Sequence, residues 1–214
     1  MQEINLLPPE IINEIAAGEV IERPVAVVKE LIENSIDARA SKITISIKEG
    51  GISKIVVSDN GIGIERKYME TSVGRHTTSK LNMRTLNNII TLGFRGEALH
   101  SICNASEFTM ISRTKDSTEA YELKVIYGKP LSIKPSKGNV GTHIKVENIF
   151  RNLPVRKKFL KSEKSESLVI RDFIKKISLA YPHISFILVE DNKAKLELAG
   201  RINNEKLKKR VLEI

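Results

Sequence analysis

The sequence predicts an α+β fold in which helices cover one face of a largely antiparallel β-sheet. Predicted helices and strands come in blocks along the chain instead of alternating, an order that is typical of α+β proteins. The predicted strands are short, rich in β-branched residues and bounded by turn-forming residues. With 214 residues, 41% of them hydrophobic, the chain is long enough to bury the core of one large domain.

The first third of the chain is expected to contain two helices followed by a β-hairpin. Pro24 suits the first turn of the second helix, because the N–H that proline lacks would have no partner there. Gly50 and Gly51 separate two β-branched segments and are expected to form the hairpin turn. The expected helices span about 9–17 and 24–37, and the expected strands span about 41–49 and 53–59.

Residues 71–96 lack a clear hydrophobic period and are rich in Gly, Thr, Ser and Asn, which predicts a long loop with room for one short helix. Loops of this length inside a compact domain are usually functional or disordered. Beyond the loop, the segment "ESLVIRDFIKKISLA" (166–180) is amphipathic and predicts a long helix. The remaining expected helices span about 97–104 and 164–180, and the remaining strands about 107–113, 119–126, 131–135, 141–147, 184–190 and 194–199.

The positive charge of the chain belongs to its C-terminal third. The net charge is +9, of which residues 151–214 contribute +8 with 16 Lys and Arg against 8 Asp and Glu. The densest segments are "VRKKFLKSEK" (155–164) and "EKLKKR" (205–210). Such clusters neutralise nucleic acid phosphates or simply form a solvated surface, and charge alone does not distinguish the two.

Composition and the N-terminal segment indicate where in the cell the protein is expected. No apolar run approaches the roughly 18 residues of a membrane span, and the N-terminal "MQEINLLPPE" lacks the features of a signal peptide. The single cysteine, Cys103, excludes an internal disulfide and is expected to be a buried small hydrophobe. An intracellular protein with no membrane partner is the expectation.

The segment "KELIENSIDA" (29–38) places polar residues within an otherwise apolar helix. Glu30, Asn34 and Asp37 follow an i, i+4, i+7 spacing and therefore share one helical face. This polar stripe is either a solvent-exposed edge or the lining of a polar site.

A second informative segment is "VSDNGIGI" (57–64), in which a predicted strand runs into Asp59. A carboxylate at a strand end can accept a hydrogen bond from an exocyclic amine, and Gly61 and Gly63 permit close backbone approach. The alternative is an ordinary Asx turn that ends the strand.

A third segment, "LGFRGEALHSI" (92–102), has Gly93 and Gly96 just before a predicted helix. Free N–H groups at such a position form a phosphate cradle or merely cap the helix. The sequence contains no GxxxxGK[ST] motif, and Arg66 stands where GxGxxG needs its third glycine. Any nucleotide is therefore bound by another route.

These three segments, in this order, resemble the ATP-binding fold of the superfamily of gyrase, heat-shock chaperones, histidine kinases and MutL. The resemblance is most specific to MutL-type DNA mismatch repair proteins, covers essentially the whole chain and is closer to bacterial members than to eukaryotic ones. It implies a Bergerat-type fold, a two-layer sandwich of a mostly antiparallel mixed sheet with helices on one face. The segments that carry it are 11–38, "DNGIGI" (59–64), "GRHTTSK" (74–80), 92–102 and "NLPVRKKFL" (152–160).

The resemblance implies specific roles in ATP hydrolysis. Glu30 aligns with the general base that activates water for attack on the γ-phosphate, and Asn34 aligns with the residue that binds Mg²⁺. Asp59 aligns with the carboxylate that reads adenine, and Thr142 in "GTHIKV" resembles the threonine that supports this contact. Glu33 and Asp37 remain open, as structural or surface groups. The other residues implied to bind ATP are Ala38, Gly61, Gly63, Thr78, Ser79, Lys80, Gly93, Phe94, Arg95, Gly96, Glu97, Ala98 and Leu99.

The resemblance further implies a slow, ATP-driven switch in DNA mismatch repair. Its implied cofactors are ATP and Mg²⁺, and its implied partners are a second copy of the chain, DNA, a MutS-type mismatch sensor and a downstream nuclease or helicase. Such a protein would act in the cytoplasm at the nucleoid if bacterial, and in the nucleus if eukaryotic. The candidates for DNA contact are Arg156, Lys157, Lys158 and Lys161.

The implied domain organisation is an ATP-binding domain over residues 1–200, with an N-terminal arm at about 1–20 and an ATP lid at about 71–96. Residues 201–214 would begin a following domain that is absent from this chain. Family members complete the site with a lysine from that domain, so weak turnover is expected. Two other classes stay open: a phosphotransferase of the histidine kinase branch, and a non-catalytic DNA-binding module.

Overall fold

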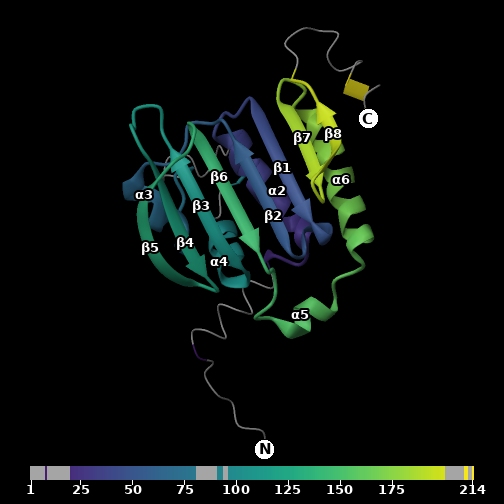
Figure 1. The fold of residues 1–214 in the computed structure, drawn as a ribbon, viewed down its shortest axis with the longest axis horizontal. Coiled ribbons are helices and arrows are strands. Elements are labelled where there is room, and N and C mark those ends of the chain that lie inside the picture. Colours follow the sequence, from purple (N-terminus) through teal and green to yellow (C-terminus); the bar gives the residue numbers. More distant parts are fainter. Residues whose placement is uncertain (1–7, 9–19, 81–90, 94–95, 201–209, 212–213) are drawn as a thin grey trace, which may run out of the picture.

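The computed structural model describes residue 8 and residues 20–80, 91–93, 96–200, 210–211 and 214. Within them the chain forms one eight-stranded sheet with helices packed against it (Figure 1). The helices are α2 (Pro24–Asp37), α3 (Arg66–Ser72), α4 (Ala98–Ala105), α5 (Pro154–Lys158) and α6 (Glu163–Ala180), with a single 3₁₀ turn, η1 (Glu49–Gly51). The strands are β1 (Lys42–Lys48), β2 (Lys54–Asp59), β3 (Glu107–Arg113), β4 (Ala120–Ile126), β5 (Lys129–Ser136), β6 (Gly141–Glu147), β7 (Ser185–Glu190) and β8 (Lys193–Leu198).

The sheet is mixed but almost entirely antiparallel. Its strand order is β5-β4-β3-β6-β2-β1-β7-β8, and β1 pairs in parallel with β7 while every other neighbouring pair is antiparallel. The long helix α6 leads from α5 into β7, so the chain returns to the sheet through a helix before β7 pairs in parallel with β1. The predicted α+β class and its antiparallel sheet are therefore confirmed.

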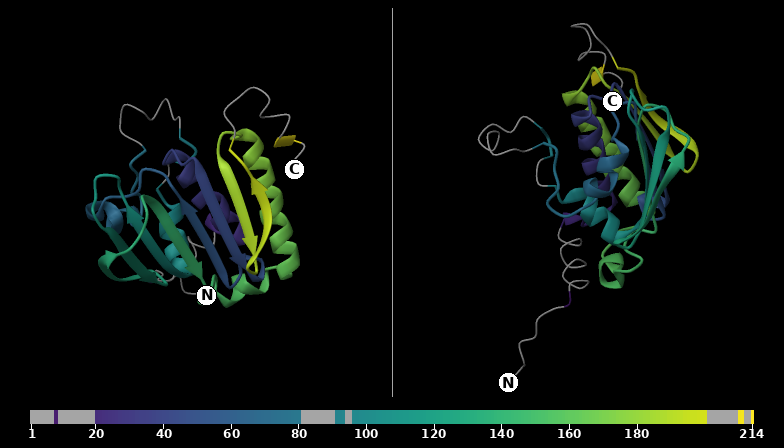
Figure 2. Two further views of the ribbon diagram at one scale, coloured as in Figure 1. Left: turned by 45° about the horizontal axis from the view of Figure 1, so that its top comes forward. Right: turned by 90° about the vertical axis from the view of Figure 1, so that its left-hand side faces the viewer.

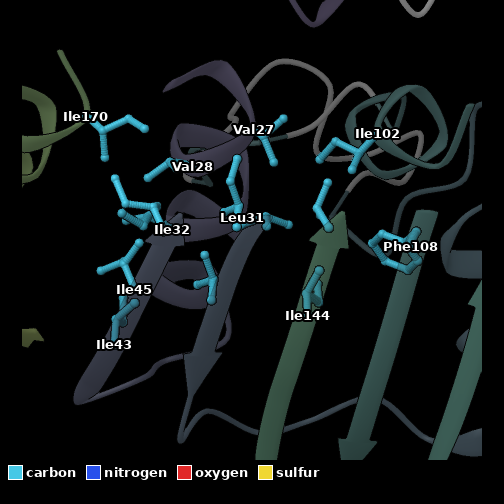
Figure 3. Close-up of a cluster of buried hydrophobic side chains, with 14 of the residues drawn as sticks. Val27, Val28, Leu31, Ile32, Ile43, Ile45, Ile102, Phe108, Ile144 and Ile170 are labelled. Atoms are coloured by element: carbon cyan, nitrogen blue, oxygen red, sulfur yellow. The ribbon is translucent and has the colours of Figure 1, made fainter. Parts of the chain in front are cut away.

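Three helices, α2, α4 and α6, lie on the same face of the sheet (Figure 2). In the strands, buried residues alternate with partly exposed ones, as in the pattern of β3, because only one face of the sheet is covered. Val27, Val28, Leu31 and Ile32 of α2 are buried in the layer between helix and strands, where Ile45 lies near Ile32 (Figure 3). The polar side of α2 is thereby left to face away from this core.

The structure contains two short helices that the sequence did not predict. α3 begins at Arg66, before the expected loop, and α5 follows β6 with Pro154 in its first turn. Helices of seven and five residues are too short to show a hydrophobic period, so their formation depends on the surrounding structure. The hairpin turn at Gly50 and Gly51 takes the form of the 3₁₀ turn η1.

Some predicted segments cannot be compared with the structure. The helix expected near 9–17 and most of residues 201–214 lie outside the described residues. Of that last segment, Arg210 is fully buried, and its guanidinium donates to the carbonyl oxygens of Pro182, Ile184 and Ala199 at 2.9–3.1 Å. No helix in the described ranges is both long enough and apolar enough to cross a membrane.

Candidate nucleotide site

A cavity of about 1120 Å³ lies on the helical side of the sheet, between α2, the end of β2 and the N-terminus of α4. Asp59 and Thr142 line it from neighbouring strands, and residues 62–64, 77–80 and 91–93 form its walls. A second cavity of about 410 Å³ between α2 and α6 contains none of the predicted site residues. The larger cavity is therefore where the sequence-predicted residues meet.

The polar stripe of α2 lines this cavity. Glu30, Asn34 and Asp37 all contribute to the cavity wall, so the stripe is not a simple solvent-exposed edge. The Glu30 side chain is 26% exposed and lies 3.7 Å from the Lys29 ammonium. Burial is the main cause that raises the pKa of the Glu33 carboxyl, with Lys29 opposing the shift.

Asp59, the last residue of β2, is held by three hydrogen bonds. Its Oδ1 accepts from the backbone N–H groups of Gly61 at 2.9 Å and Thr142 at 3.2 Å, and its Oδ2 accepts from the Ser35 hydroxyl at 2.9 Å. A carboxylate offers about four acceptor positions, so one remains on Oδ2. Burial raises the Asp59 pKa despite these three hydrogen bonds, each of which favours the carboxylate.

The glycine loop after β2 requires close backbone contacts. Gly63 has a φ of 72°, and a Cβ there would overlap the Arg113 carbonyl oxygen. A Cβ on Gly61 would lie 2.6 Å from the Ala38 carbonyl oxygen. Glycine at both positions thus lets the loop lie directly against its neighbours, and Asp59 does close an Asx-type turn through the N–H of Gly61.

Ser112 connects this loop to the start of β6. Its hydroxyl accepts from the Ile64 N–H at 2.8 Å and lies 3.0 Å from both the Gly141 carbonyl oxygen and the Thr142 hydroxyl. Ser112 is buried, so this network holds Thr142 beside Asp59 without help from solvent.

Asp37 binds both sequence segments that flank residues 81–90. Its Oδ2 accepts from the Lys80 ammonium at 2.6 Å and the Gly93 N–H at 3.2 Å, and its Oδ1 accepts from the Leu92 N–H at 3.1 Å. The same ammonium donates to Asn34 Oδ1 at 2.8 Å. Asp37 is therefore a structural anchor of the cavity wall and not a surface group.

The segment 77–80 also packs against the start of α4. Gly96 has a φ of 67°, and a Cβ there would overlap the Thr77 carbonyl oxygen. His76 Nδ1 lies 3.3 Å from the Glu97 carboxylate, and the Thr78 hydroxyl accepts from the Lys80 N–H at 3.1 Å. These contacts bring the "TTSK" segment and the glycine-rich segment into one wall.

The structure thus places most of the predicted nucleotide-site residues in one cavity wall. Phe94 and Arg95 lie outside the described residues. Gly61 is adjacent to the wall and contacts Ala38. The predicted residues that line the cavity are Glu30, Asn34, Ala38, Asp59, Gly63, Thr78, Ser79, Lys80, Gly93, Gly96, Glu97, Ala98, Leu99 and Thr142.

Sequence reasoning missed two residues that shape this site and left a third open. Ser35 and Ser112 each hold a predicted site residue in place, but an isolated serine in a helix or strand carries no signal of this kind. Asp37 did carry a signal, since it lies on the same helical face as Glu30 and Asn34.

The donor set of the cavity fits a magnesium ion held mainly by phosphate. No cluster of three or more His, Cys, Asp or Glu suited to a metal occurs among the described residues. Mg²⁺ in nucleotide sites is usually bound through one or two protein oxygens together with phosphate oxygens. Asn34 Oδ1 already contacts the cationic Lys80, which shows that this oxygen is directed at a position where a cation is stabilised.

The four candidate residues for DNA contact lie apart from the cavity. α5 and the residues after it lie at the end of the sheet where β6 stops, opposite the end that carries Asp59 and Thr142 (Figure 1). Lys157, Lys158 and Lys161 are exposed and Arg156 is half-buried. Phe159, 77% exposed, lies among them.

Comparison with known proteins agrees with this geometry. Residues 22–134 match the family model described as histidine kinase-, DNA gyrase B- and HSP90-like ATPase. The chain is 46% identical over 213 residues to the DNA mismatch repair protein MutL of Rickettsia prowazekii, and 44% identical over 214 residues to that of Mannheimia succiniciproducens. These alignments cover 99% of this chain but 36% and 34% of the relatives, so the chain spans about a third of their length.

A solved structure gives the same result for the fold. The Aquifex aeolicus MutL ATPase domain complexed with ADP superposes with a TM-score of 0.76 at 36% sequence identity, covering 91% of this chain and 69% of that chain. Both the order of sequence motifs and the backbone thus agree with one family. This chain belongs to the MutL family of DNA mismatch repair proteins, within the histidine kinase-, gyrase B- and HSP90-like ATPases, and corresponds to the family's ATPase domain.

Proposed function

We propose that this chain binds ATP with Mg²⁺ and hydrolyses it slowly, acting as a conformational switch in DNA mismatch repair. The observation that supports this most strongly is one cavity lined by Asp59, which Ser35 of α2 holds, and by Glu30 and Asn34 of the α2 polar face. A nucleotide needs a base-reading group and a phosphate-handling group at separate positions, and this arrangement supplies both.

Asp59 is the proposed adenine reader. Oδ1 is occupied by two N–H donors, so the remaining acceptor position on Oδ2 is available to the N6 amine of adenine. Guanine presents a carbonyl oxygen at the corresponding position, and two acceptors facing each other in a buried site are unfavourable. The pocket should therefore prefer adenine nucleotides to guanine nucleotides.

Glu30 and Asn34 are the proposed catalytic pair. They lie one helical turn apart on the same face, so a water held by the Glu30 carboxylate and a metal held by Asn34 would be neighbours. Mg²⁺ would bridge phosphate oxygens and neutralise the charge that develops during transfer to water. A neutral amide is suited to this position because it binds the ion without repelling the triphosphate.

The remaining glycine-rich residues are the proposed phosphate contacts. The backbone at Gly96, Ala98 and Leu99 lies at the start of α4, where free N–H groups bind anions. Thr78, Ser79, Lys80 and Gly93 line the same part of the cavity and are proposed to enclose the triphosphate. Glu97 and Ala38 complete the wall.

We further propose that ATP binding drives association of two such domains and that the α5 surface contacts DNA phosphates. Cationic side chains bind the DNA backbone independently of sequence, which fits a protein that must act wherever a mismatch occurs. A MutS-type sensor and a downstream nuclease or helicase are the proposed partners. Because the compared relatives are bacterial, the proposed location is the cytoplasm at the nucleoid.

The experiment that tests this function is calorimetric titration with β,γ-imido ATP and Mg²⁺, with the guanine counterpart as the matched control. Binding of the adenine form, with guanine binding at least about tenfold weaker, is expected from the loss of one buried hydrogen bond. Equal affinity for the two bases would contradict the role of Asp59. Absence of any nucleotide binding would contradict the proposed function as a whole.

A further inference from the structure

The Lys80 ammonium lies on the amide oxygen that is the proposed magnesium ligand. It donates to Asn34 Oδ1 at 2.8 Å and to Asp37 Oδ2 at 2.6 Å, so one cation bridges two polar residues of the same α2 face. The Lys80 side chain is 19% exposed and that of Asp37 is 9% exposed. This contact is therefore a largely desolvated charge pair, which is held much more strongly than a surface ion pair.

The cavity wall makes room for this ammonium. A Cβ on Gly93 would lie 3.2 Å from Lys80 Nζ and 3.8 Å from Asn34 Oδ1, tighter than an ordinary contact with the ammonium. The Gly93 N–H also donates to Asp37 Oδ2, the oxygen that pairs with Lys80. Gly93, Asp37 and Asn34 thus form three sides of a small cation-binding position.

A lysine ammonium and a hydrated magnesium ion cannot both bind Asn34 Oδ1 strongly at the same time. Mg²⁺ binds an oxygen ligand at about 2.0–2.1 Å and keeps a rigid octahedral shell of further oxygens around it. An ammonium group that donates to the same oxygen would lie within a few ångströms of the ion, and two cations at that separation repel each other in a partly buried site. One of them must leave Asn34 when the other is bound.

We propose that Lys80 is a built-in cation that holds Asn34 until Mg²⁺ arrives with the nucleotide and displaces it. This inference rests on the proposed function and adds an exchange between a protein cation and the metal. Without metal, the lysine supplies positive charge beside the triphosphate. With metal, Lys80 leaves Asn34 and pairs with Asp37 or with a phosphate oxygen. Lys80 is thus a positioning residue that reduces the dependence of nucleotide binding on Mg²⁺.

The test compares the affinity for β,γ-imido ATP measured by calorimetry in Mg²⁺ and in EDTA. The quantity of interest is the ratio of the Kd in EDTA to the Kd in Mg²⁺. For Lys80→Met we expect this ratio to rise at least about tenfold, because metal-free binding loses the positive charge that lies on Asn34, worth about one charge-assisted hydrogen bond. The Kd in Mg²⁺ should rise less than the Kd in EDTA, because the ion then supplies the positive charge beside Asn34, and less Mg²⁺ should half-saturate the preformed complex.

Matched variants separate this role from a general loss of charge or of folding. Lys176→Met removes an exposed lysine of α6 that pairs with Asp172 and lines the smaller cavity, not the nucleotide cavity, and it should leave the ratio unchanged. Lys80→Arg keeps a cation and should give a ratio close to that of the wild type. Lys80→Gln is a second neutral variant, and thermal melts by circular dichroism identify any variant that is unfolded.

Two results would overturn the proposal. Equal losses in Mg²⁺ and EDTA would make Lys80 an ordinary phosphate ligand that never competes with the metal. Unchanged affinities in both conditions would show that Lys80 has no part in binding. If the wild type binds the analogue but the ratio does not respond, the exchange fails while the proposed function stands. If the wild type binds in neither condition, the proposed function fails first.

Discussion

The Ser35 hydroxyl lies 2.9 Å from Asp59 Oδ2 and 3.0 Å from the Leu31 carbonyl oxygen, so helix α2 directly positions the carboxylate at the end of β2. Ser35 is 3% exposed, which means that water does not substitute for this contact. The hydrogen bond both orients Asp59 and favours its ionised form. Base recognition and ionisation of Asp59 are thereby linked through one serine.

This link predicts how nucleotide affinity depends on pH. The Asp59 pKa is raised above 3.8 by burial, so the carboxylate that accepts from adenine is lost at a higher pH than for an exposed aspartate. Ser35→Ala removes a contact that lowers this pKa. Calorimetry between about pH 4.5 and 7.5 should show the fall in affinity beginning at higher pH in Ser35→Ala. Ser132→Ala, at an exposed position of β5, is the control. Identical profiles for all three proteins would argue against the link.

Asp59→Asn should lower the affinity for nucleotide without lowering the thermal stability at pH 7. Because folding raises the Asp59 pKa, the folded chain holds this proton more tightly than the unfolded chain. The stabilising contribution is thus present below the unfolded pKa and lost as pH rises through the folded pKa. At pH 7 the asparagine protein should have a Tm equal to or above that of the wild type, with affinity for β,γ-imido ATP lower by about 10- to 100-fold. A clearly lower Tm at pH 7 would show that the charge itself holds the fold.

Glu30→Gln should remove hydrolysis but not binding. A general base of this kind contributes about 10²–10⁴-fold to the rate, whereas the neutral amide keeps the shape of the cavity wall. Phosphate release from ATP should fall by that factor, with the Kd for the non-hydrolysable analogue within about threefold of wild type. Glu70→Gln, on the exposed side of α3, is the matched control. Hydrolysis of ATP by Glu30→Gln at the wild-type rate would contradict the role of Glu30 as the general base.

The contact between Arg23 and Glu166 should contribute strongly to stability. The Glu166 carboxylate is 1% exposed and accepts from two Arg23 nitrogens at 3.0 and 3.1 Å, which joins the start of α2 to α6. Arg23→Ala leaves a buried carboxylate short of a partner, and a loss of about 2–4 kcal/mol in the free energy of unfolding is expected. Lys176→Ala breaks an exposed pair with Asp172 and should cost less than about 1 kcal/mol in the same urea titration. Similar losses for both variants would contradict the special role of burial.

The proposed DNA surface makes a prediction about salt. Lys157→Gln combined with Lys158→Gln should weaken DNA binding about equally for all sequences and lower the slope of log affinity against log salt by about 2. Lys193→Gln with Lys195→Gln removes the same charge from exposed positions on β8 and is the matched control. If both double variants behave alike, net charge and not the α5 surface governs binding.

Whether a helix or strand could be predicted from the sequence depends on its length. α2, α6 and all eight strands were predicted within a few residues, because each is long enough for a hydrophobic period to be visible. α3 and α5 were missed, since their five to seven residues form helices only where the surrounding chain holds them. The motif residues Glu30, Asn34 and Asp59 were identified from sequence because their spacing and their neighbouring glycines carry the pattern.

The sequence by itself determined the α+β class, the polar face of α2 and the glycines that allow close backbone contact, because these depend on local periodicity and on the backbone freedom of glycine. Only the tertiary structure decided what this polar face meets. Ser35 reaches Asp59 across 24 positions and Lys80 reaches Asn34 across 46, and no local pattern encodes either contact. Both contacts exist because packing α2 on the sheet buries its apolar side and turns its polar side toward β2 and the residues before α4. The placement of each charge, and therefore its pKa and its partner, follows from that packing.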